Sequence, residues 1–301
     1  MKIPMQRSPL VLAFAVFASI IFADLASTAP PSGEAGGNKD AHRIVSLAPS
    51  VTEILYALGL HDRVAGVTRY CVYPPEAKQK PNVGGYINPS LEAIRSLDPD
   101  VVFLLSEHAD LVLSLQKLHI RIVQLDHNSI NGILASIHTI AEIGGDPAAG
   151  DRLAAGIESR LSQLRLSHAG QRRPRVLMGF DRTSGSGRLE MMVPGKGTIF
   201  ADLLETAGGD NAAGGERYRI LSTEGILRLD PDVVILLAGE SDGMPKRREA
   251  TLDTWKNLVS LRAAQQNRVF MVSGSELVVP GPRLLLLGER FANILDGKEH
   301  P

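Results

Sequence analysis

Residues 90–105 read SLEAIRSLDPDVVFLL, and residues 222–237 read STEGILRLDPDVVILL. Aligned without gaps, the two stretches are identical at 11 of 16 positions, at an offset of 132 residues. The same offset places Arg43-Ile44-Val45 on Arg175-Val176-Leu177. A helix, an Asp-Pro-Asp turn and a buried strand therefore occur twice in the chain, and the repeat predicts two similar lobes.

Short β-branched runs alternate along the chain with stretches in which apolar residues recur at helical spacing. This alternation is typical of α/β folds whose sheets are mainly parallel. The predicted strands are residues 44–47, 101–105, 121–125, 176–180, 233–237 and 269–272. The predicted helices are residues 51–58, 91–97, 199–207 and 223–229. Each half then has the order strand, helix, turn, helix, Asp-Pro-Asp, strand, helix, strand.

Residues 129–167 contain no predicted strand. Their apolar positions keep helical spacing on both sides of Gly144-Gly145-Asp146-Pro147, which either kinks one long helix or splits it into two. We expect a helical connector here, between an N-terminal α/β lobe at 42–128 and a C-terminal α/β lobe at 168–301. Ligands of open α/β sheets bind beyond the carboxyl ends of the strands, so we expect a ligand cleft between the lobes. The alternative is a duplicated scaffold without a cleft function.

The first 29 residues have the features of a secretory signal peptide. Lys2 and Arg7 precede an apolar run at 10–23, and small residues follow up to Ala29. The run has 14 residues, fewer than the roughly 20 that span a bilayer, although an uncleaved anchor is an alternative. Residues 30–41 are small, polar and rich in glycine and proline, and we interpret them as a flexible lead-in. The pattern predicts a periplasmic location.

The composition excludes several classes of protein. The 301 residues include 32 basic and 33 acidic side chains, giving a net charge of −1. This balance provides no global field and argues against nucleic acid as a partner. The one cysteine, Cys71, excludes an intramolecular disulfide, a cysteine zinc knuckle and a cysteine-ligated iron–sulfur cluster. No cysteine directly follows the apolar run at 10–23, so we expect no lipoprotein anchor.

Glu92 and Glu224 occupy the same position in the two copies of the repeat, two residues after a serine that can cap the helix. A capping-box acid lies three residues after the cap. These two carboxylates are therefore free to point outward, in a first turn where the helix dipole stabilises them. One such acid has a purely structural explanation, but a matched pair is suited to bidentate contacts with arginines of a two-fold partner. We interpret the Asp-Pro-Asp turns as structural.

Five segments, taken in order, carry a resemblance to a known family. They are RIVSLAPSVTEILYALGL, GVTRYCVYPP, GGYINPSLEAI, LDPDVVFL and VPGPR. Together they resemble the cobalamin, ferric-siderophore and haem class of periplasmic substrate-binding proteins of ABC importers, over nearly the whole mature chain. The resemblance implies two lobes with a rigid connecting helix and a ligand clamped between them. It also implies that one glutamate on each lobe docks onto arginines of a membrane permease, and Glu92 and Glu224 fall on those positions.

The resemblance further implies a set of ligand-binding residues. Tyr70 and Tyr86 match positions where cobalamin-binding members present aromatic rings to the corrin, and flat apolar faces suit a macrocycle. Ser50 and Phe180 fall on cleft-facing positions of the family, and Arg182 follows in the loop after Phe180. Each has a structural alternative: packed surface tyrosines, a helix cap, a core side chain and a surface arginine.

The C-terminal lobe departs from the cobalamin-binding pattern. Ser275 and Val279 stand where that pattern has an acid and a base, which leaves a corrinoid, a ferric siderophore and haem as possible ligands. His108 follows a predicted strand and could face the cleft and ligate a cobalt or iron centre, or it could be a solvated loop residue. Cys71 could be a soft ligand, although a small buried cysteine is more usual. No His-x-x-x-His pair occurs, which argues against a bare metal site, and no resident cofactor is expected.

Enzyme motifs are missing from the sequence. It has no Gly-x-Ser-x-Gly elbow, no phosphate-binding loop ending in Gly-Lys-Ser/Thr, and no Gly-x-Gly-x-x-Gly run after a strand. We therefore predict a monomeric, non-enzymatic solute-binding protein that captures a corrinoid and delivers it to an ABC permease. A ferric-siderophore or haem carrier is the alternative within the class, and a periplasmic chelatase-like metalloenzyme is the alternative outside it.

Overall fold

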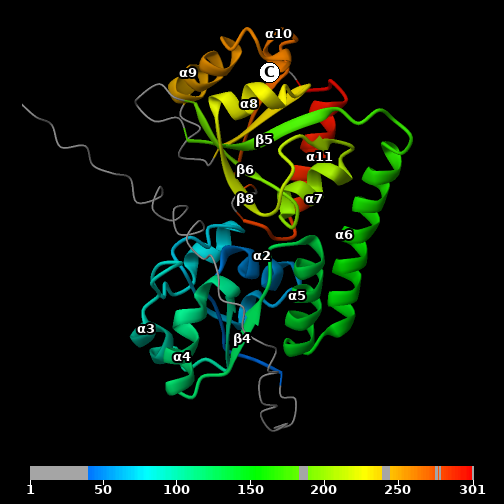
Figure 1. The fold of residues 1–301 in the computed structure, drawn as a ribbon. Helices are drawn as coiled ribbons and strands as arrows, with labels where there is room; N and C mark the ends of the chain where they lie inside the picture. Colours follow the sequence, from blue (N-terminus) through cyan, green and yellow to red (C-terminus); the bar gives the residue numbers. More distant parts are fainter. Residues whose placement is uncertain (1–39, 183–188, 239–244, 275–276, 278, 300–301) are drawn as a thin grey trace, which may run out of the picture. The chain divides into compact units, whose positions relative to one another are not determined.

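The computed structural model describes residues 40–182, 189–238, 245–274, 277 and 279–299 (Figure 1). The predicted signal peptide and all but the end of the predicted lead-in therefore lie outside the described residues. Residues 40–301 form one compact unit. No helix among the described residues is long and apolar enough to cross a membrane.

The first sheet has four strands, all parallel, in the order β2-β1-β3-β4. The strands are β1 (Ile44–Ser46), β2 (Val64–Val67), β3 (Val101–Leu105) and β4 (Ile122–Leu125). Its helices are α2 (Pro49–Ala57), α3 (Leu91–Ser96) and α4 (Ala109–Lys117), with short 3-10 turns η2 (His61–Arg63), η3 (Pro75–Gln79) and η4 (Ser106–His108). Side chains of α3 and α4 pack on one face of this sheet, and those of α2 and α5 (Ile130–Ile143) pack on the other.

The second sheet is mixed. Its order is β10-β9-β5-β6-β8, with β7 also paired to β5. The strands are β5 (Arg175–Asp181), β6 (Glu190–Pro194), β7 (Asp210–Asn211), β8 (Tyr218–Ser222), β9 (Val233–Ala238) and β10 (Val269–Ser273). The pairs β10·β9, β9·β5 and β5·β7 are parallel, whereas β6 runs antiparallel to both β5 and β8. The antiparallel strands β6 and β8 were not predicted from the sequence.

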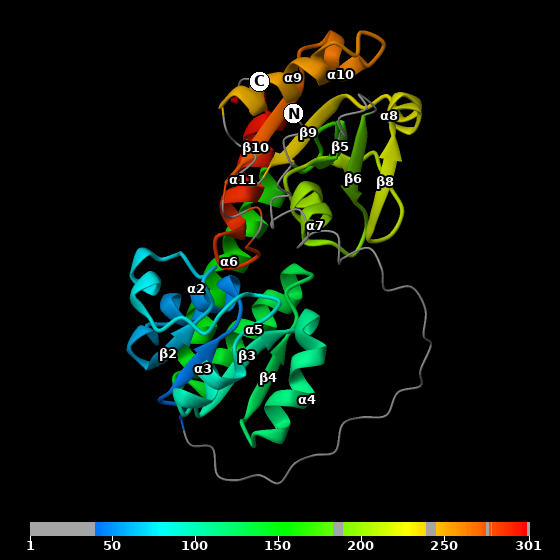
Figure 2. The ribbon, with the colours of Figure 1, turned by 90° about the vertical axis from the view of Figure 1, so that its left-hand side faces the viewer.

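Helices cover both faces of the second sheet. They are α7 (Ile199–Thr206), α8 (Thr223–Leu229), α9 (Pro245–Lys256), α10 (Arg262–Gln265) and α11 (Leu284–Leu295). Apolar side chains of α7 and α11 pack on one face with those of α6 (Pro147–Ser167), and Trp255 and Leu261 pack with α8 on the other. Figure 2 shows α7 and α11 on the opposite side of β5 and β9 from α9 and α10.

The sequence repeat is reproduced in the strand register. In the first sheet Ile44 pairs with Val101, and in the second Val176 pairs with Val233. Both partners are shifted by the 132-residue offset of the sequence repeat. The order β1-β3-β4 of the first sheet corresponds to β5-β9-β10 of the second. All six predicted strands and all four predicted helices are present, and the prediction of an α/β fold with two similar halves is confirmed.

The two copies share a clamp at the amino ends of their strands. In the first copy Asp100 Oδ2 accepts the backbone N–H groups of His42 (2.7 Å) and Arg43 (2.8 Å). The Arg43 guanidinium in turn donates to the carbonyl oxygens of Leu97 and Asp98, at the end of α3. The last turn of the helix and the start of two strands are thereby tied together.

The second copy repeats these contacts. Asp232 Oδ2 accepts the Arg175 N–H at 3.0 Å, and Arg175 Nη1 donates to the Leu229 carbonyl at 2.8 Å. Asp98 and Asp230, the first acids of the two Asp-Pro-Asp turns, both have positive φ, 44° and 40°. The left-handed residue ends each helix, and the second acid holds the first strand of its sheet, which explains the repeated motif structurally.

The predicted connector is two helices rather than one. Helix α5 ends before Gly144, Gly145 has φ of 77°, and α6 starts at Pro147 with Asp146 capping it through a bond from Ala149 N at 2.9 Å. A left-handed glycine followed by a proline at the first helical position separates the helices cleanly. Helix α6 packs against α5 and also against α7 and α11, so it contacts helices that cover the first sheet and helices that cover the second (Figure 1).

Candidate functional site

Parallel strands bring the loops after their carboxyl ends to one edge of a sheet. At that edge of the first sheet, Ser50 follows β1 and Tyr70 follows β2. Glu107 and His108 follow β3, and His127 follows β4. Ser50, Tyr70 and His108, which the sequence analysis named, thus come from the same edge, and they are joined there by Glu107 and His127.

Ser50 is not a helix cap. The N-cap of α2 is Ala48, and no side chain caps this helix. Ser50 is buried, and its Oγ lies 2.7 Å from Nδ1 of His127, which is also buried. The Nε2 atom of His127 is buried without a hydrogen-bond partner among the described residues. Burial lowers the pKa of His127 to about 4, against an opposing effect of the Asp126 carboxylate, so the ring is neutral at physiological pH.

A buried ion pair lies one helical turn further along α2. Arg283 Nε donates to Glu53 Oε2 at 3.0 Å, and Arg283 Nη2 donates to Glu53 Oε1 at 2.5 Å. The Glu53 side chain is 3% exposed and that of Arg283 15%, so the pair is largely shielded from water. The ring of Tyr73 lies 4.0 Å from the guanidinium carbon in a cation–π contact. The late Val-Pro-Gly-Pro-Arg segment is therefore held on the first helix.

Tyr86 and His108 form a packed pair at the same edge. Their ring centroids are 4.6 Å apart in an edge-to-face arrangement, and Tyr86 Oη donates to Glu107 Oε1 at 3.2 Å. Burial, and then the Glu107 carboxylate, raise the pKa of Tyr86, which stays a neutral donor. Leu105 N–H donates to His108 Nδ1 at 3.1 Å, so Nε2 carries the proton and donates to the Tyr86 carbonyl at 2.8 Å. His108 is buried and supports the Tyr86 loop; the solvated-histidine alternative is wrong.

The loop between β2 and α3 exposes a group of large apolar side chains. Tyr70 is 44% exposed, Val72 43%, Tyr73 44% and Ile87 57%. Cys71, between two of them, is buried, with its Sγ 3.3 Å from Thr68 Oγ1. Burial raises the pKa of its thiol, so Cys71 behaves as a small buried residue rather than a reactive one. Exposed apolar groups of this kind mark binding surfaces more often than isolated ones do.

The two candidates of the C-terminal half follow β5. Phe180 is half-buried at the end of this strand, and its ring packs edge-to-face on Phe200 with centroids 5.6 Å apart. Arg182 is exposed, and its backbone N–H donates to the Glu190 carbonyl at 2.8 Å. Ser275 lies outside the described residues, whereas Val279 is buried. Among the described residues, no group of three or more His, Cys, Asp or Glu side chains could hold a metal ion.

The two predicted docking acids are both on the surface. Glu92 lies in the first turn of α3 and Glu224 in the first turn of α8, and both are exposed. Ser90 Oγ caps α3 through Ala93 N at 3.2 Å, and Ser222 Oγ caps α8 through Gly225 N at 3.4 Å. The serines supply the caps, so the carboxylates are left for contacts outside the helices. Among the described residues, neither acid has a side-chain hydrogen-bond or ion-pair partner.

Several site residues were not found from the sequence. Glu53 is the one charged residue of the PSVTEILYA helix, and an acid among buried positions was the available signal. Its partner Arg283 is 230 residues away, so no local pattern could join them. His127 follows β4 in an Asp-His-Asn run, and no spacing in the sequence distinguishes it from the other scattered histidines.

One parallel and one mixed sheet, built on one repeat and with polar and aromatic loops at their carboxyl edges, define the class of two-sheet α/β ligand-binding proteins. Comparison with known proteins agrees. The chain belongs to the periplasmic binding protein family, whose model matches residues 44–274.

Similar proteins include ones that are named for binding vitamin B12 or haem. An ABC transporter substrate-binding lipoprotein of Bacillus subtilis (strain 168), YvrC, is 30% identical over 257 residues, covering 82% of this chain and 77% of that protein. The vitamin B12-binding protein of Salmonella paratyphi A is 28% identical over 259 residues, covering 85% and 90%. The solved structure of the periplasmic haem-binding protein BhuT with two haems has a TM-score of 0.72 at 26% identity, covering 85% of this chain and all of that one.

The buried neutral state of His127 predicts a pH dependence of stability. Its folded pKa, about 4, lies below the unfolded value near 6.5, so the unfolded chain binds the extra proton between these values. Stability is complete above about pH 6.5 and falls as the pH drops toward 4. Between pH 7 and pH 5, wild type should lose about 2 kcal/mol more unfolding free energy than His127→Gln, as measured by urea denaturation.

The matched control is His119→Asn, which changes an exposed histidine on a left-handed turn. This variant should keep the wild-type difference between the two pH values. Equal pH dependence in wild type and His127→Gln would show that His127 is not held neutral by the fold.

Proposed function

We propose that this protein is a periplasmic solute-binding protein that captures a corrinoid and delivers it to an ABC permease in the inner membrane. In this proposal the N-terminal segment is a signal peptide, and the mature protein acts as a monomer without catalytic turnover. The ligand is held between an N-terminal lobe at 42–128 and a C-terminal lobe at 168–301, joined by the helices of 129–167.

The observation that carries the proposal is the matched placement of Glu92 and Glu224. Each lies in the first turn of the repeat helix of its own half, and each is exposed beside a serine that already caps the helix. A repeated surface acid has no role in either core. Two such carboxylates suit a partner that presents two arginine sites related by symmetry, as a permease dimer would.

The choice of a corrinoid rests on the loop between β2 and α3. Tyr70, Val72, Tyr73 and Ile87 offer a broad apolar surface that suits the face of a macrocycle. Tyr86 belongs to the same loop, and its hydroxyl, which donates to Glu107, is proposed to lie near a side-chain amide of the corrin. Ser50 is buried against His127 and is proposed to support the site rather than to offer its hydroxyl to the ligand. The vitamin B12-binding relatives support the same choice. Phe180 and Arg182 are proposed to face the ligand from the second half.

Haem is the second candidate ligand. The observation that favours it is the similarity to the haem-bound BhuT structure over most of both chains. Arg182 is exposed and could pair with a propionate. A ferric siderophore remains the third candidate of this class.

Calorimetric titration with cyanocobalamin, haemin and a ferric siderophore tests the ligand. We expect cyanocobalamin to bind most tightly, and Tyr70→Ala to weaken it by about tenfold through loss of a stacked ring. The control Leu113→Ala removes a side chain of α4 that is 66% exposed, and should leave the affinity unchanged. The recovered ligand should be chemically unchanged. Preference for haemin would favour the second candidate, and turnover would contradict the carrier role.

Charge reversal tests docking separately. Glu92→Lys with Glu224→Lys should abolish binding to the cognate permease in nanodiscs, because each lysine would face an arginine. Ligand affinity should stay within about twofold, since surface charges away from the ligand contribute little. Glu158→Lys, an exposed acid on α6, is the control and should still dock. Docking by the double variant, or a large loss of ligand affinity, would contradict the assignment.

A further inference from the structure

A pocket lies at the opposite edge of the second sheet from Phe180 and Arg182. Its volume is about 310 Å³. The amino ends of β5, β9 and β10 meet there because these strands are parallel neighbours. The residues that line it are Arg172, Pro174, Asp232, Arg262, Gln266, Arg268 and Leu295. Nothing in the proposed transport function uses this edge.

Three guanidinium groups reach the pocket from three separate segments. Both terminal nitrogens of Arg262 are bonded to acids: Nη1 donates to Asp232 Oδ1 at 2.9 Å, and Nη2 donates to Asp230 Oδ2 at 2.8 Å. Asp232 is held ionised: burial raises its pKa, but the Arg175 N–H and Arg262 outweigh this effect and lower it. The carboxylates of Asp230 and Asp232 offset two of the three arginine charges, so the pocket keeps a net positive charge.

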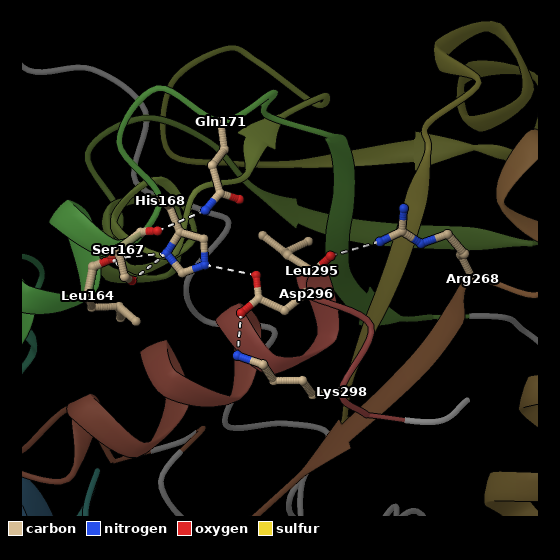
Figure 3. Close-up of polar contacts among 8 residues, drawn as sticks. All are labelled: Leu164, Ser167, His168, Gln171, Arg268, Leu295, Asp296 and Lys298. Atoms are coloured by element: carbon tan, nitrogen blue, oxygen red, sulfur yellow. Dashed lines mark hydrogen bonds and ion pairs between the residues drawn. The ribbon is translucent and has the colours of Figure 1, made fainter.

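Arg172 and Arg268 carry the remaining positive charge. The Arg172 side chain is 86% exposed and approaches Asp232 only to 3.9 Å. Arg268 is half-buried, and the one side-chain hydrogen bond that it makes to described residues runs from Nη2 to the Leu295 carbonyl at 3.3 Å (Figure 3). The neighbouring Asp296 is not available to Arg268, since it is bonded to His168 at 3.1 Å and Lys298 at 2.7 Å (Figure 3).

These contacts indicate an anion of particular chemistry. A half-buried guanidinium bonded only to a carbonyl is suited to an incoming oxyanion, and arginine forks match phosphate oxygens. A tetrahedral group accepts from donors on several sides, and Arg172 and Arg268 line the pocket from two separate segments. The pocket is larger than a bare phosphate needs, and Pro174 and Leu295 give it an apolar wall for a small organic part.

We infer that the pocket formed by Arg172, Arg262 and Arg268 at the amino edge of the second sheet binds a small phosphomonoester. Arg268 and Arg172 contact the phosphate group. Arg262, held in place by Asp230 and Asp232, lines the pocket beside them. In the first sheet Arg121 directly precedes β4, as Arg268 directly precedes β10. Arg121 is exposed rather than half-buried. Arg121 therefore serves as an internal control for Arg268.

Titration of the whole protein with glycerol 3-phosphate, inorganic phosphate and succinate tests the inference, read out by calorimetry and by the ³¹P resonance of the phosphate compounds. Glycerol 3-phosphate should bind most tightly and succinate most weakly. Arg268→Gln should weaken glycerol 3-phosphate by about tenfold or more, and Arg268→Lys by less, because it keeps the charge. Arg121→Gln should bind like wild type.

Several outcomes would overturn the inference. These are no binding of glycerol 3-phosphate up to about 10 mM, equal binding of succinate, or equal losses in Arg268→Gln and Arg121→Gln. If Arg268→Gln does not fold, Arg172→Gln decides, because this side chain is almost fully exposed and its replacement leaves the core untouched. It should also weaken glycerol 3-phosphate, and unchanged affinity would count against the site.

Discussion

The ion pair between Glu53 and Arg283 is the interaction on which the arrangement of the candidate site depends. It joins the first helix to a segment 230 residues later, in surroundings nearly free of water. Removing one partner of such a pair typically costs about 3–5 kcal/mol, because the other charge is left buried alone. Gly281 lies directly against this contact: a Cβ there would come within 3.0 Å of Glu53 Oε2 and 3.4 Å of the Ser50 Cα. The pair and the glycine together hold the late segment on the helix that carries Ser50.

The repeated clamps lie at the amino edges of the two sheets, opposite the carboxyl edges where the ligand is proposed to bind. At the amino ends of the strands, Asp100 and Asp232 each bond the backbone of an arginine that in turn caps a helix. These bonds fix where each first strand starts, and through the strand register they fix where the loops at the far ends emerge. Variation is then free to occur in those loops, which is where the exposed tyrosines of the first half lie. The duplicated scaffold accounts for the two matched helices that carry Glu92 and Glu224.

Most of the parallel framework could be predicted from the sequence, because buried parallel strands are continuous β-branched runs and the repeat fixed their correspondence. Strands β6 and β8 escaped prediction since EMMVP and YRILS carry no comparable β-branched run, and they pair antiparallel. The surface position of Glu92 could be predicted from its offset from the serine cap. The pairing of Glu53 with Arg283, and of Ser50 with His127, could not, because these contacts join residues distant in sequence whose meeting is set by tertiary packing.

In the proposed function, a macrocyclic ligand binds at the carboxyl edges of the two sheets. Hydrogen–deuterium exchange with and without saturating cyanocobalamin measures this directly, because amides covered by ligand exchange more slowly. Slower exchange should be confined to the loop that holds Tyr70 and Tyr86, the turn at His108, and the end of β5 at Phe180. The clamps at Asp100 and Asp232, on the opposite edges, should exchange as in the free protein. Protection centred on those clamps, or none in the tyrosine loop at saturation, would contradict the claim.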